Sequence, residues 1–240
     1  MDRPGRFIMI DGIAGSGKST ILRSADAWAK RCGHRVFDLQ VWMKEHKDPP
    51  TFSEVAEHDV FFTSEPTRTW VGAAIRFELS RTDEPYSGTS LAHAFSLDRE
   101  IMYKRLIIPA LEAGKTVIQD RGVCTSLVYQ PIMPDGMSLR KLMKLPGNAL
   151  ALKYAPDALI LTDLDATTAV ERLRGRSEES RGVFADLAFL QKVTRRFRSR
   201  WFSLLFQHYG SSVHSFDTDI PLPEMLARSE KLLDHLLPTC

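Results

Sequence analysis

The sequence predicts an α/β fold in which a parallel central sheet is covered by helices on both faces. Short apolar runs alternate with longer helical patterns, which is typical of such a sheet. A phosphate-binding signature directly follows the first apolar run. The chain has 240 residues, of which 43% are hydrophobic and 26% charged, enough for one core of this kind. We therefore interpret residues 1–240 as a single domain.

Strands are predicted where four or more residues form a run rich in aliphatic, aromatic or β-branched side chains, bounded by polar or turn-forming residues. The first run precedes the phosphate-binding signature, and the others recur at intervals long enough to hold a helix. The last run is the weakest because polar residues interrupt it. The candidates are residues 7–10, 35–39, 60–63, 116–119, 158–162 and 213–216.

Helices are predicted between these runs where apolar residues recur at spacings of three and four. The candidates are residues 19–31, 71–79, 90–112, 139–153, 166–174, 184–209 and 223–237. In residues 184–209 this spacing predicts a buried stripe made of Phe189, Leu190, Val193, Phe197, Trp201, Leu204 and Leu205. The opposite face is basic, and we interpret it as solvated rather than as a nucleic-acid surface.

Two segments stand outside the alternation of strands and helices. Residues 41–58 are polar and contain Pro49-Pro50, which predicts an insert without a helix at the prolines. Residues 175–183 are small and charged, and predict a mobile surface loop inside a lid segment at about 172–184.

Composition excludes several classes of protein. A net charge of +2 gives no reason to expect nucleic-acid binding. The sequence contains no run of 18 apolar residues, so no membrane span is predicted. A cleaved leader would remove the phosphate-binding signature, so we expect a cytoplasmic protein. Cys32, Cys124 and Cys240 lack metal-ligand spacing and are predicted to be reduced thiols rather than a disulfide scaffold.

The phosphate-binding signature is the strongest chemical signal. The segment Gly12-Ile13-Ala14-Gly15-Ser16-Gly17-Lys18-Ser19 matches G-x-x-x-x-G-K-[ST] and lies between a predicted strand and a predicted helix. Glycines let backbone N–H groups turn toward phosphate oxygens, and the following helix adds its positive end. Lys18 is expected to reach the β- and γ-phosphates and Ser19 to hold Mg²⁺. The chain is therefore expected to bind a nucleoside triphosphate.

A second signal is Asp120-Arg121, directly after the fourth strand candidate. Ligands of open parallel sheets bind at the carboxyl ends of the strands. A carboxylate there can face Mg²⁺ or its water, and an arginine beside it can hold a phosphate through two parallel hydrogen bonds.

A third signal begins at the end of the third strand candidate. Glu65-Pro66 is followed by Arg68 and Arg76, which places two cations near the predicted mouth of the site. On the next helix Phe95 and Arg99 are four residues apart and share one face, so a ring and a guanidinium could hold a nucleobase. A core position is the alternative for Phe95.

Taken together, these segments resemble the thymidylate kinase family of P-loop nucleoside monophosphate kinases. The resemblance rests on their order and spacing over roughly residues 5–237, apart from the insert. The most specific parts are Phe95-x-x-x-Arg99 and the Asp120-Arg121 block with Tyr129-Gln130. It implies a P-loop NTPase fold with three α/β/α layers, a parallel central sheet and a lid. It also implies ATP and Mg²⁺ as cofactors, small nucleotides as partners, and a homodimer.

The resemblance further implies a role for each matching position. ATP would be held by residues 12–20, ending at Thr20. Phe95 would stack on thymine, Arg99 would bind its carbonyl oxygen, and Arg121 would hold the acceptor phosphate. Asp120 and Ser19 would organise Mg²⁺. The remaining substrate-side positions are Asp11, Glu65, Arg68, Arg76, Ser126, Tyr129 and Gln130, of which Ser126 and Gln130 would line the base pocket and Tyr129 would crowd the sugar 2′ position.

Family members whose P-loop lacks a catalytic arginine supply arginines from the lid instead. This P-loop has Gly15 at that place. The resemblance therefore implies lid arginines, and the candidates are Arg172, Arg174, Arg176 and Arg181. Positive charge on the transferring group is what phosphoryl transfer requires, and a closing lid supplies it while excluding water.

Several positions depart from the family pattern, mostly on the acceptor side. They are Ala14, Ser64, Ala73 and Gly122, where an aspartate, an arginine, a glutamate and an aromatic residue are usual, together with the insert. A kinase for a modified deoxynucleoside monophosphate is therefore an alternative to a dTMP kinase.

A deoxynucleoside kinase is a second candidate enzyme. This class also combines a P-loop with Glu-Pro and a following tryptophan, and it uses the glutamate as a base toward a 5′-hydroxyl. Arg121 and the lid arginines favour a monophosphate acceptor over a nucleoside. A non-catalytic nucleotide-binding protein is a third candidate, which Lys18, Ser19 and Asp120 argue against.

Overall fold

The computed structural model describes residues 3–80, 86–174 and 186–238. Six strands form one all-parallel sheet in the order β2-β3-β4-β1-β5-β6. Their bounds are β1 Arg6–Gly12, β2 Val36–Asp38, β3 Val60–Ser64, β4 Thr116–Asp120, β5 Ala158–Asp163 and β6 Ser212–Asp217. Each of the six strand predictions is confirmed to within two residues at either end, because short apolar runs in a buried parallel sheet leave little freedom in the assignment.

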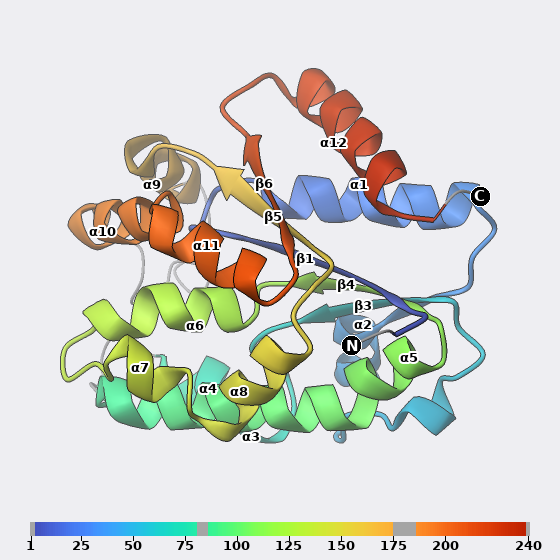
Figure 1. Ribbon diagram of the computed structural model, residues 1–240, viewed down its shortest axis with the longest axis horizontal. Helices are drawn as coiled ribbons and strands as arrows, with labels where there is room; N and C mark the ends of the chain where they lie inside the picture. The colour runs from blue at the N-terminus through green and yellow to red at the C-terminus, as the bar shows by residue number, and fades with distance from the viewer. Residues whose placement is uncertain (1–2, 81–85, 175–185, 239–240) are drawn as a thin grey trace.

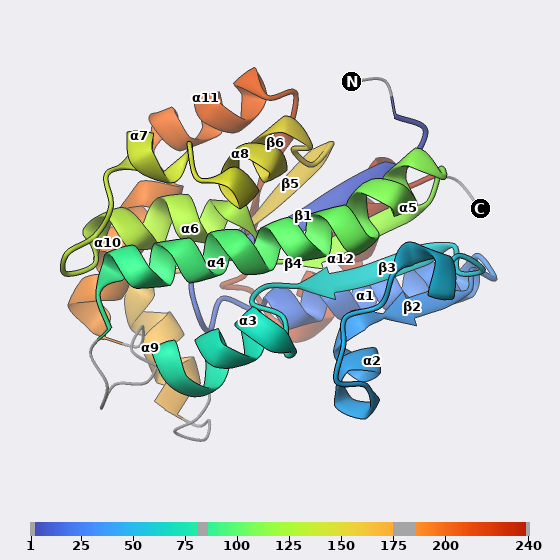
Figure 2. The same ribbon diagram turned by 90° about the horizontal axis from the view of Figure 1, so that it is seen from below.

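Helices cover both faces of the sheet, as the sequence predicts (Figure 1). On one face α1 (Lys18–Arg31) packs against α12 (Leu222–Leu236). On the other, α4 (Gly88–Met102) runs alongside α6 (Val123–Tyr129) and α8 (Pro146–Lys153), as Figure 2 shows. Alternate residues of β1 enter the two cores: Phe7 and Met9 face one, Ile8 and Ile10 the other.

Several predicted helices are interrupted. Residues 90–112 form α4, a π-helical turn at Tyr103–Ile107 and α5 (Ile108–Glu112). Residues 139–153 divide into α7 (Leu139–Leu142) and α8, where Pro146 begins the second helix and Leu145 is extended. Residues 71–79 are α3 (Trp70–Ala74) followed by a π-helical turn at Ile75–Leu79.

A further interruption corrects the predicted apolar stripe. Residues 184–209 contain α10 (Leu187–Phe197) and α11 (Arg200–His208), separated at Ser199, whose backbone is extended. The break rotates the buried face of the second helix. Phe202 and Phe206 are therefore fully buried, whereas Leu204 is 51% exposed.

The insert lies between β2 and β3 and has no helix at Pro49-Pro50, as the sequence predicts, but it contains a helix that the sequence analysis does not predict. Asp38 caps a helix, α2 (Leu39–Glu45), by accepting hydrogen bonds from the backbone N–H groups of Gln40 (2.7 Å) and Val41 (3.2 Å). A 3₁₀ turn follows at Phe52–Glu54. Leu39 and Met43 are buried, so this segment packs on the domain instead of lying free in solvent.

The last two observations concern the cysteines and the length of the apolar helices. Cys32 is disulfide-bonded, so the prediction of reduced thiols is wrong for this residue, whereas Cys124 is a buried free thiol. Within the described ranges, no helix combines the length and hydrophobicity that crossing a bilayer requires.

Candidate active site

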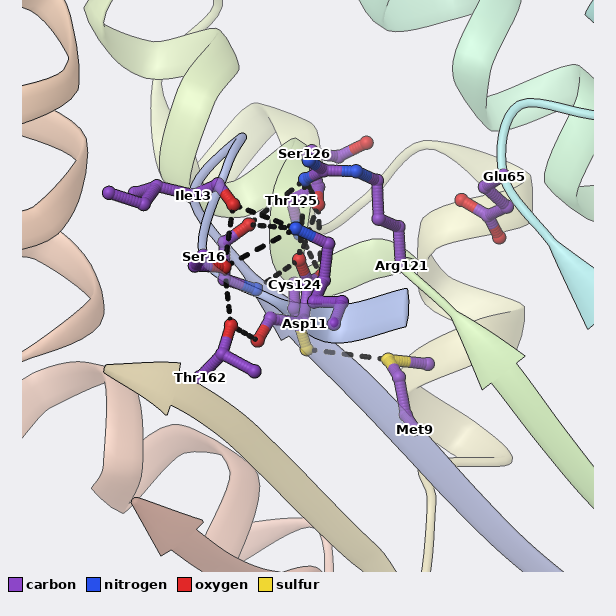
Figure 3. A network of polar contacts seen from close by, with 12 residues as sticks. Met9, Asp11, Ile13, Ser16, Glu65, Arg121, Cys124, Thr125, Ser126 and Thr162 are labelled. Carbon is purple, nitrogen blue, oxygen red and sulfur yellow. Dashed lines mark hydrogen bonds and ion pairs between the residues drawn. The ribbon is translucent and has the colours of Figure 1, made fainter. Parts of the chain in front are cut away.

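The phosphate-binding loop connects β1 to α1 and is anchored at its base. Gly12, Gly15 and Gly17 have φ angles of 146°, 79° and 84°, which side chains disfavour. The Ser16 hydroxyl lies 2.7 Å from the carbonyl of Ile13 and 2.6 Å from the hydroxyl of Thr162 on β5. The loop is therefore fixed to the carboxyl end of a neighbouring strand, as Figure 3 shows.

Lys18 points back into this loop. Its Nζ donates to the carbonyls of Ile13 (2.7 Å) and Gly12 (3.3 Å), and the residue is only 8% exposed. A buried ammonium that donates to the carbonyls of the loop is a favourable site for phosphate oxygens. Ser19, one position later, is exposed at the first turn of α1.

Helix α9 (Ala166–Arg174) closes against the same loop. A Cβ added at Gly15 would lie 2.6 Å from the backbone oxygen of Ala169. The position therefore has no room for a larger side chain unless α9 moves. An arginine at this position would therefore clash with α9 as it stands.

Asp11 connects the loop to helix α6. Its fully buried carboxylate accepts hydrogen bonds from the backbone of Gly12 (2.7 Å) and from the backbone and hydroxyl of Thr125 (3.0 and 2.8 Å). Burial raises the pKa of Asp11, and the nearby charges of Arg121 and Lys18 oppose that shift. Through these contacts Asp11 holds the start of the P-loop against the first turn of α6.

Asp120 and Arg121 stand where β4 ends, beside the loop. Arg121 adopts a left-handed φ of 63°, and its Nη1 donates to the carbonyl of Gly12 at 3.0 Å and to the hydroxyl of Thr125 at 3.4 Å. Figure 3 shows its side chain extending from the strand end toward Thr125. The turn of the chain after β4 therefore carries this cation over the P-loop rather than into solvent.

The carboxylate of Asp120 has a different environment. Its Oδ1 is buried and has no hydrogen-bond partner among the described residues. A buried carboxylate oxygen without a partner is costly unless a cation or water pairs with it. Together with the exposed hydroxyl of Ser19, this donor set fits Mg²⁺, which keeps several waters and takes few protein ligands.

On the acceptor side, Arg99 is the centre of a buried polar cluster. It is 0% exposed and pairs through Nε (3.0 Å) and Nη2 with the two carboxylate oxygens of Glu65. Nη2 also donates to Ser126 Oγ at 2.9 Å, and Nη1 donates to Asn148 Oδ1. Gln119 Nε2 donates to Glu65 at 3.1 Å. Burial raises the pKa of Glu65 to about 7, despite the opposing charge of Arg99.

Phe95 lies on the same helix as Arg99 and is half-buried. It belongs to neither of the two apolar cores formed by the described residues. The core alternative for this ring is therefore not favoured. Phe95 and Arg99 are four residues apart on α4 and therefore lie on the same side of the helix.

Tyr129 and Gln130, which are predicted to line the substrate pocket, are both almost completely buried. Tyr129 is 4% exposed, and its ring centroid lies 5.8 Å from that of Phe189 and 6.4 Å from that of Phe197 on α10. Burial raises its pKa, with Arg121 opposing. Gln130 is 3% exposed, and its Oε1 lacks a hydrogen-bond partner within the described part of the chain.

Of the other two arginines, Arg68 lies in the turn after β3 and Arg76 lies in the π-helical turn at Ile75–Leu79. Thr67 is held by Asp98, which accepts from its backbone N–H at 2.8 Å. Arg76 Nε donates to the carbonyls of Pro66 and Thr67, both at 2.9 Å. Burial lowers the pKa of Arg76 to about 10, and the charge of Arg68 adds to this effect. The charges of Asp120 and Arg121 also act on Arg76, which indicates one cluster of charges at this edge.

The lid arginines are only partly described. Arg174 is exposed at the end of α9. Arg172 Nη2 instead donates to the carbonyl of Thr218 at 3.1 Å and lies 3.5 Å from Asp219. Arg176 and Arg181, and most of the predicted lid, lie outside the described residues.

The structure thus brings the sequence-predicted residues of three neighbouring strands to one edge of the sheet. Sequence reasoning missed several residues that hold them there, namely Gln40, Asp98, Gln119, Thr125, Asn148 and Thr162. The sequence offers a signal for Thr125, because this residue follows Asp120-Arg121 within about one helical turn. Asn148 carried no signal, since it is one amide on a distant helix.

Comparisons with known proteins agree with this geometry. The sequence model of the family described as thymidylate kinase matches residues 50–204. A probable thymidylate kinase of Pyrococcus abyssi is 34% identical over 196 residues, 80% of each chain. A thymidylate kinase of Caldicellulosiruptor saccharolyticus is 27% identical over 233 residues, 97% of this chain and 98% of its own. The second similarity includes the P-loop, which precedes the residues matched by the family model.

Proposed function

The chain belongs to the thymidylate kinase family, and from that premise we propose that it transfers the γ-phosphoryl group of ATP to dTMP, giving dTDP and ADP. The observation that carries the proposal is the convergence of β1, β3 and β4. Gly12, Glu65 and Asp120 end these neighbouring strands or directly follow them, and the backbone N–H of Glu65 donates to the carbonyl of Asp120 at 3.1 Å.

On the donor side, the loop amides and Lys18 bind the ATP phosphates. Lys18 exchanges its carbonyl partners for phosphate oxygens, which keeps the buried ammonium paired. Asp120 and Ser19 would hold Mg²⁺, which, when bound, neutralises charge on the phosphates. Because Gly15 leaves no room for an arginine, the exposed Arg174 and the lid arginines are proposed to supply the remaining charge.

On the acceptor side, Arg99 and Phe95 are proposed to hold thymine, and Arg121, Arg76 and Arg68 its 5′-phosphate. The five N–H groups of Arg99 include one on Nη1 that no described residue accepts. Arginine only donates, so this group suits a carbonyl such as that of thymine and not an exocyclic amino group.

The nucleoside-kinase alternative requires Glu65 to act as a base toward a 5′-hydroxyl. Both of its oxygens are already occupied by Arg99, and Gln119 donates to one of them. A carboxylate held in this way serves to orient an arginine rather than to accept a proton from substrate. The geometry therefore favours the monophosphate acceptor.

An ADP-release assay with Mg-ATP tests the proposal against dTMP, dUMP, dCMP, UMP, thymidine and deoxycytidine. Preferred turnover of dTMP is the expected result. Turnover of nucleosides alone would overturn it and reassign Glu65 as a base. If none of these acceptors is turned over while ATP still binds, the acceptor is a modified nucleotide or the protein has a non-catalytic role. A homodimer is part of the same proposal, from family resemblance, and light scattering of the purified protein checks it.

A further inference from the structure

The insert between β2 and β3 contacts the acceptor turn directly. We define the strap as residues 39–50, which include α2 and Pro49-Pro50. The turn it meets, residues 64–70, leaves β3 at the sheet edge where Asp120 leaves β4, because Ser64 and Asp120 are paired in register. The strap therefore touches a segment that carries the proposed phosphate-binding arginine, Arg68.

Gln40 makes the first connection. Its amide nitrogen donates to the hydroxyl of Ser64, and its amide oxygen accepts from Arg68 Nε at 2.7 Å. The backbone N–H of Arg68 lies 3.2 Å from the sulfur of Met43, one turn later on α2. One side chain thus holds the strand end and the guanidinium at the same time.

Asp48 makes the second connection. Its Oδ1 accepts from Trp70 Nε1 at 2.8 Å, and its backbone carbonyl accepts from Trp42 Nε1 at 3.2 Å. Arg105 lies with its guanidinium carbon 5.3 Å from the centre of a Trp70 ring and donates from Nη2 to the carbonyl of Pro49 at 2.7 Å. Trp70, though 46% exposed, is therefore clamped between the strap and the π-helical turn that extends α4.

The two connections leave the functional end of Arg68 open. Only Nε of its guanidinium is engaged, and among the described residues neither Nη nitrogen forms a hydrogen bond. Two Nη groups on a guanidinium whose third nitrogen is fixed are preorganised for phosphate oxygens. Arg68 also lies close enough to Arg76 for its charge to affect that residue, so the open end belongs to the cationic cluster.

We propose that the strap is a positioning element for the acceptor phosphate, in which Gln40 orients Arg68 and the Asp48–Trp70 contact keeps the turn in place. The inference rests on the proposed function, because it takes the acceptor to be a nucleoside monophosphate. The inference gives a role to an insert that is longer than the usual connection. In it, the oriented Arg68 supplies the positive charge that an arginine at position 64 commonly supplies in the family, where this chain has Ser64.

The test compares binding of an acceptor with and without its phosphate. In Gln40→Leu, the dissociation constant for dTMP is expected to rise about tenfold, the effect of one hydrogen bond to a charged group. Thymidine, which lacks the phosphate, is expected to bind as in the wild type. The KM for ATP is expected to stay unchanged. Val41→Ala is the matched control, because Val41 is the next residue of α2 and is 51% exposed.

Further variants separate positioning from folding. Gln40→Glu keeps an acceptor for Arg68 Nε and is expected to restore most of the dTMP affinity. In an Arg68→Ala background, Gln40→Leu is expected to have no further effect, because its influence passes through Arg68. Asp48→Ala is expected to weaken dTMP binding, and Asp48→Asn, which retains the oxygen, to preserve it.

Equal loss of dTMP and thymidine affinity in Gln40→Leu would overturn the inference, since it would show general loosening of the acceptor site. Additive effects of the Gln40 and Arg68 substitutions would also overturn it. Failure of the proposed function is a separate result, because it would appear in the wild type as absent dTMP turnover before any variant is made.

Discussion

Arg99 and Glu65 form a two-point ion pair that is almost completely removed from solvent. Arg99 is 0% exposed and Glu65 is 5% exposed, so neither side chain can exchange its partner for water without the surrounding structure opening. Asn148 and Ser126 take two further donors of the guanidinium. The direction of its remaining N–H is therefore fixed by the protein, which is the preorganisation that the proposed contact with the base requires.

This pair predicts a pH dependence of stability. Burial raises the pKa of Glu65 from 4.5 to about 7, so the folded protein holds a proton that the unfolded chain has released between these values. Its contribution to stability is complete below pH 4.5 and is lost as pH rises through 7, at most about 1.4 kcal/mol per pH unit. In Glu65→Gln this slope is expected to disappear.

Urea unfolding of both proteins at several pH values measures the difference. Because Gln lacks the titration, the wild-type free energy of unfolding minus that of the variant should decrease from about pH 5 to about pH 8. A constant difference would mean that Arg99 keeps Glu65 ionised throughout this range.

Phe95 predicts a selective effect on the acceptor. If its ring stacks on the base, Phe95→Ala should raise the KM for dTMP by roughly ten- to a hundredfold, the usual strength of stacking between a base and an aromatic ring. The KM for ATP should stay within about twofold. Steady-state kinetics with each substrate varied in turn measures both. Leu97→Ala is the control, since Leu97 is on the same helix and 49% exposed. Equal changes for both substrates would indicate a packing role.

The sequence predicts the sheet and the tight loop before α1 well because both depend on local signals. Apolar runs define the strands, and the spacing of Gly12 to Ser19 requires a tight turn before a helix. It predicts less of the helical layer, where single residues decide. The extended backbone at Ser199 rotates the buried face of α11, and an Asp38 cap starts α2 inside a polar segment.

The acceptor side shows a different limit. Phe95 and Arg99 are found from spacing on one helix, but the environment of Arg99 depends on residues far away in the chain. Asn148 and Glu65 reach it from other elements, and neither distance nor partner is encoded in a local pattern. The resemblance implies that Arg99 faces the substrate; the structure adds that most of its donors are committed to protein groups.

Asp120 predicts a metal-dependent effect that is larger than its effect on stability. Its Oδ1 has no hydrogen-bond partner among the described residues, so Asp120→Asn removes no hydrogen bond to that oxygen. It removes only the charge that acts on Arg76 and Arg121, and the melting temperature is expected to fall slightly. If the carboxylate organises Mg²⁺, kcat should fall at least about tenfold, and half-maximal activity should need more Mg²⁺. Activity titrated with Mg²⁺ checks this. An unchanged titration curve would remove Asp120 from the metal site.

Lys18 predicts loss of the chemical step. Lys18→Ala removes the ammonium that is proposed to face the phosphates, and turnover should fall roughly a hundredfold or more. Lys30→Ala is the control on the same helix, because Lys30 forms an exposed pair with Asp26 that contributes little. Near wild-type kcat in Lys18→Ala, measured by ADP release, would refute the assignment of the loop.

Gly15 predicts that the P-loop tolerates no side chain at position 15. At φ 79° an alanine is strained by about 1 kcal/mol, and its Cβ would also lie 2.6 Å from the oxygen of Ala169 on α9. Gly33 isolates the first effect, since it has a φ of 71° and nothing within 4 Å of an added Cβ. Both alanine variants should therefore lose similar stability from strain, measured by urea unfolding. Only Gly15→Ala should also raise the KM for ATP, because the clash displaces the loop or α9. If Gly15→Ala and Gly33→Ala behave alike in both measurements, α9 yields freely and the absence of an arginine at this position has no steric cause.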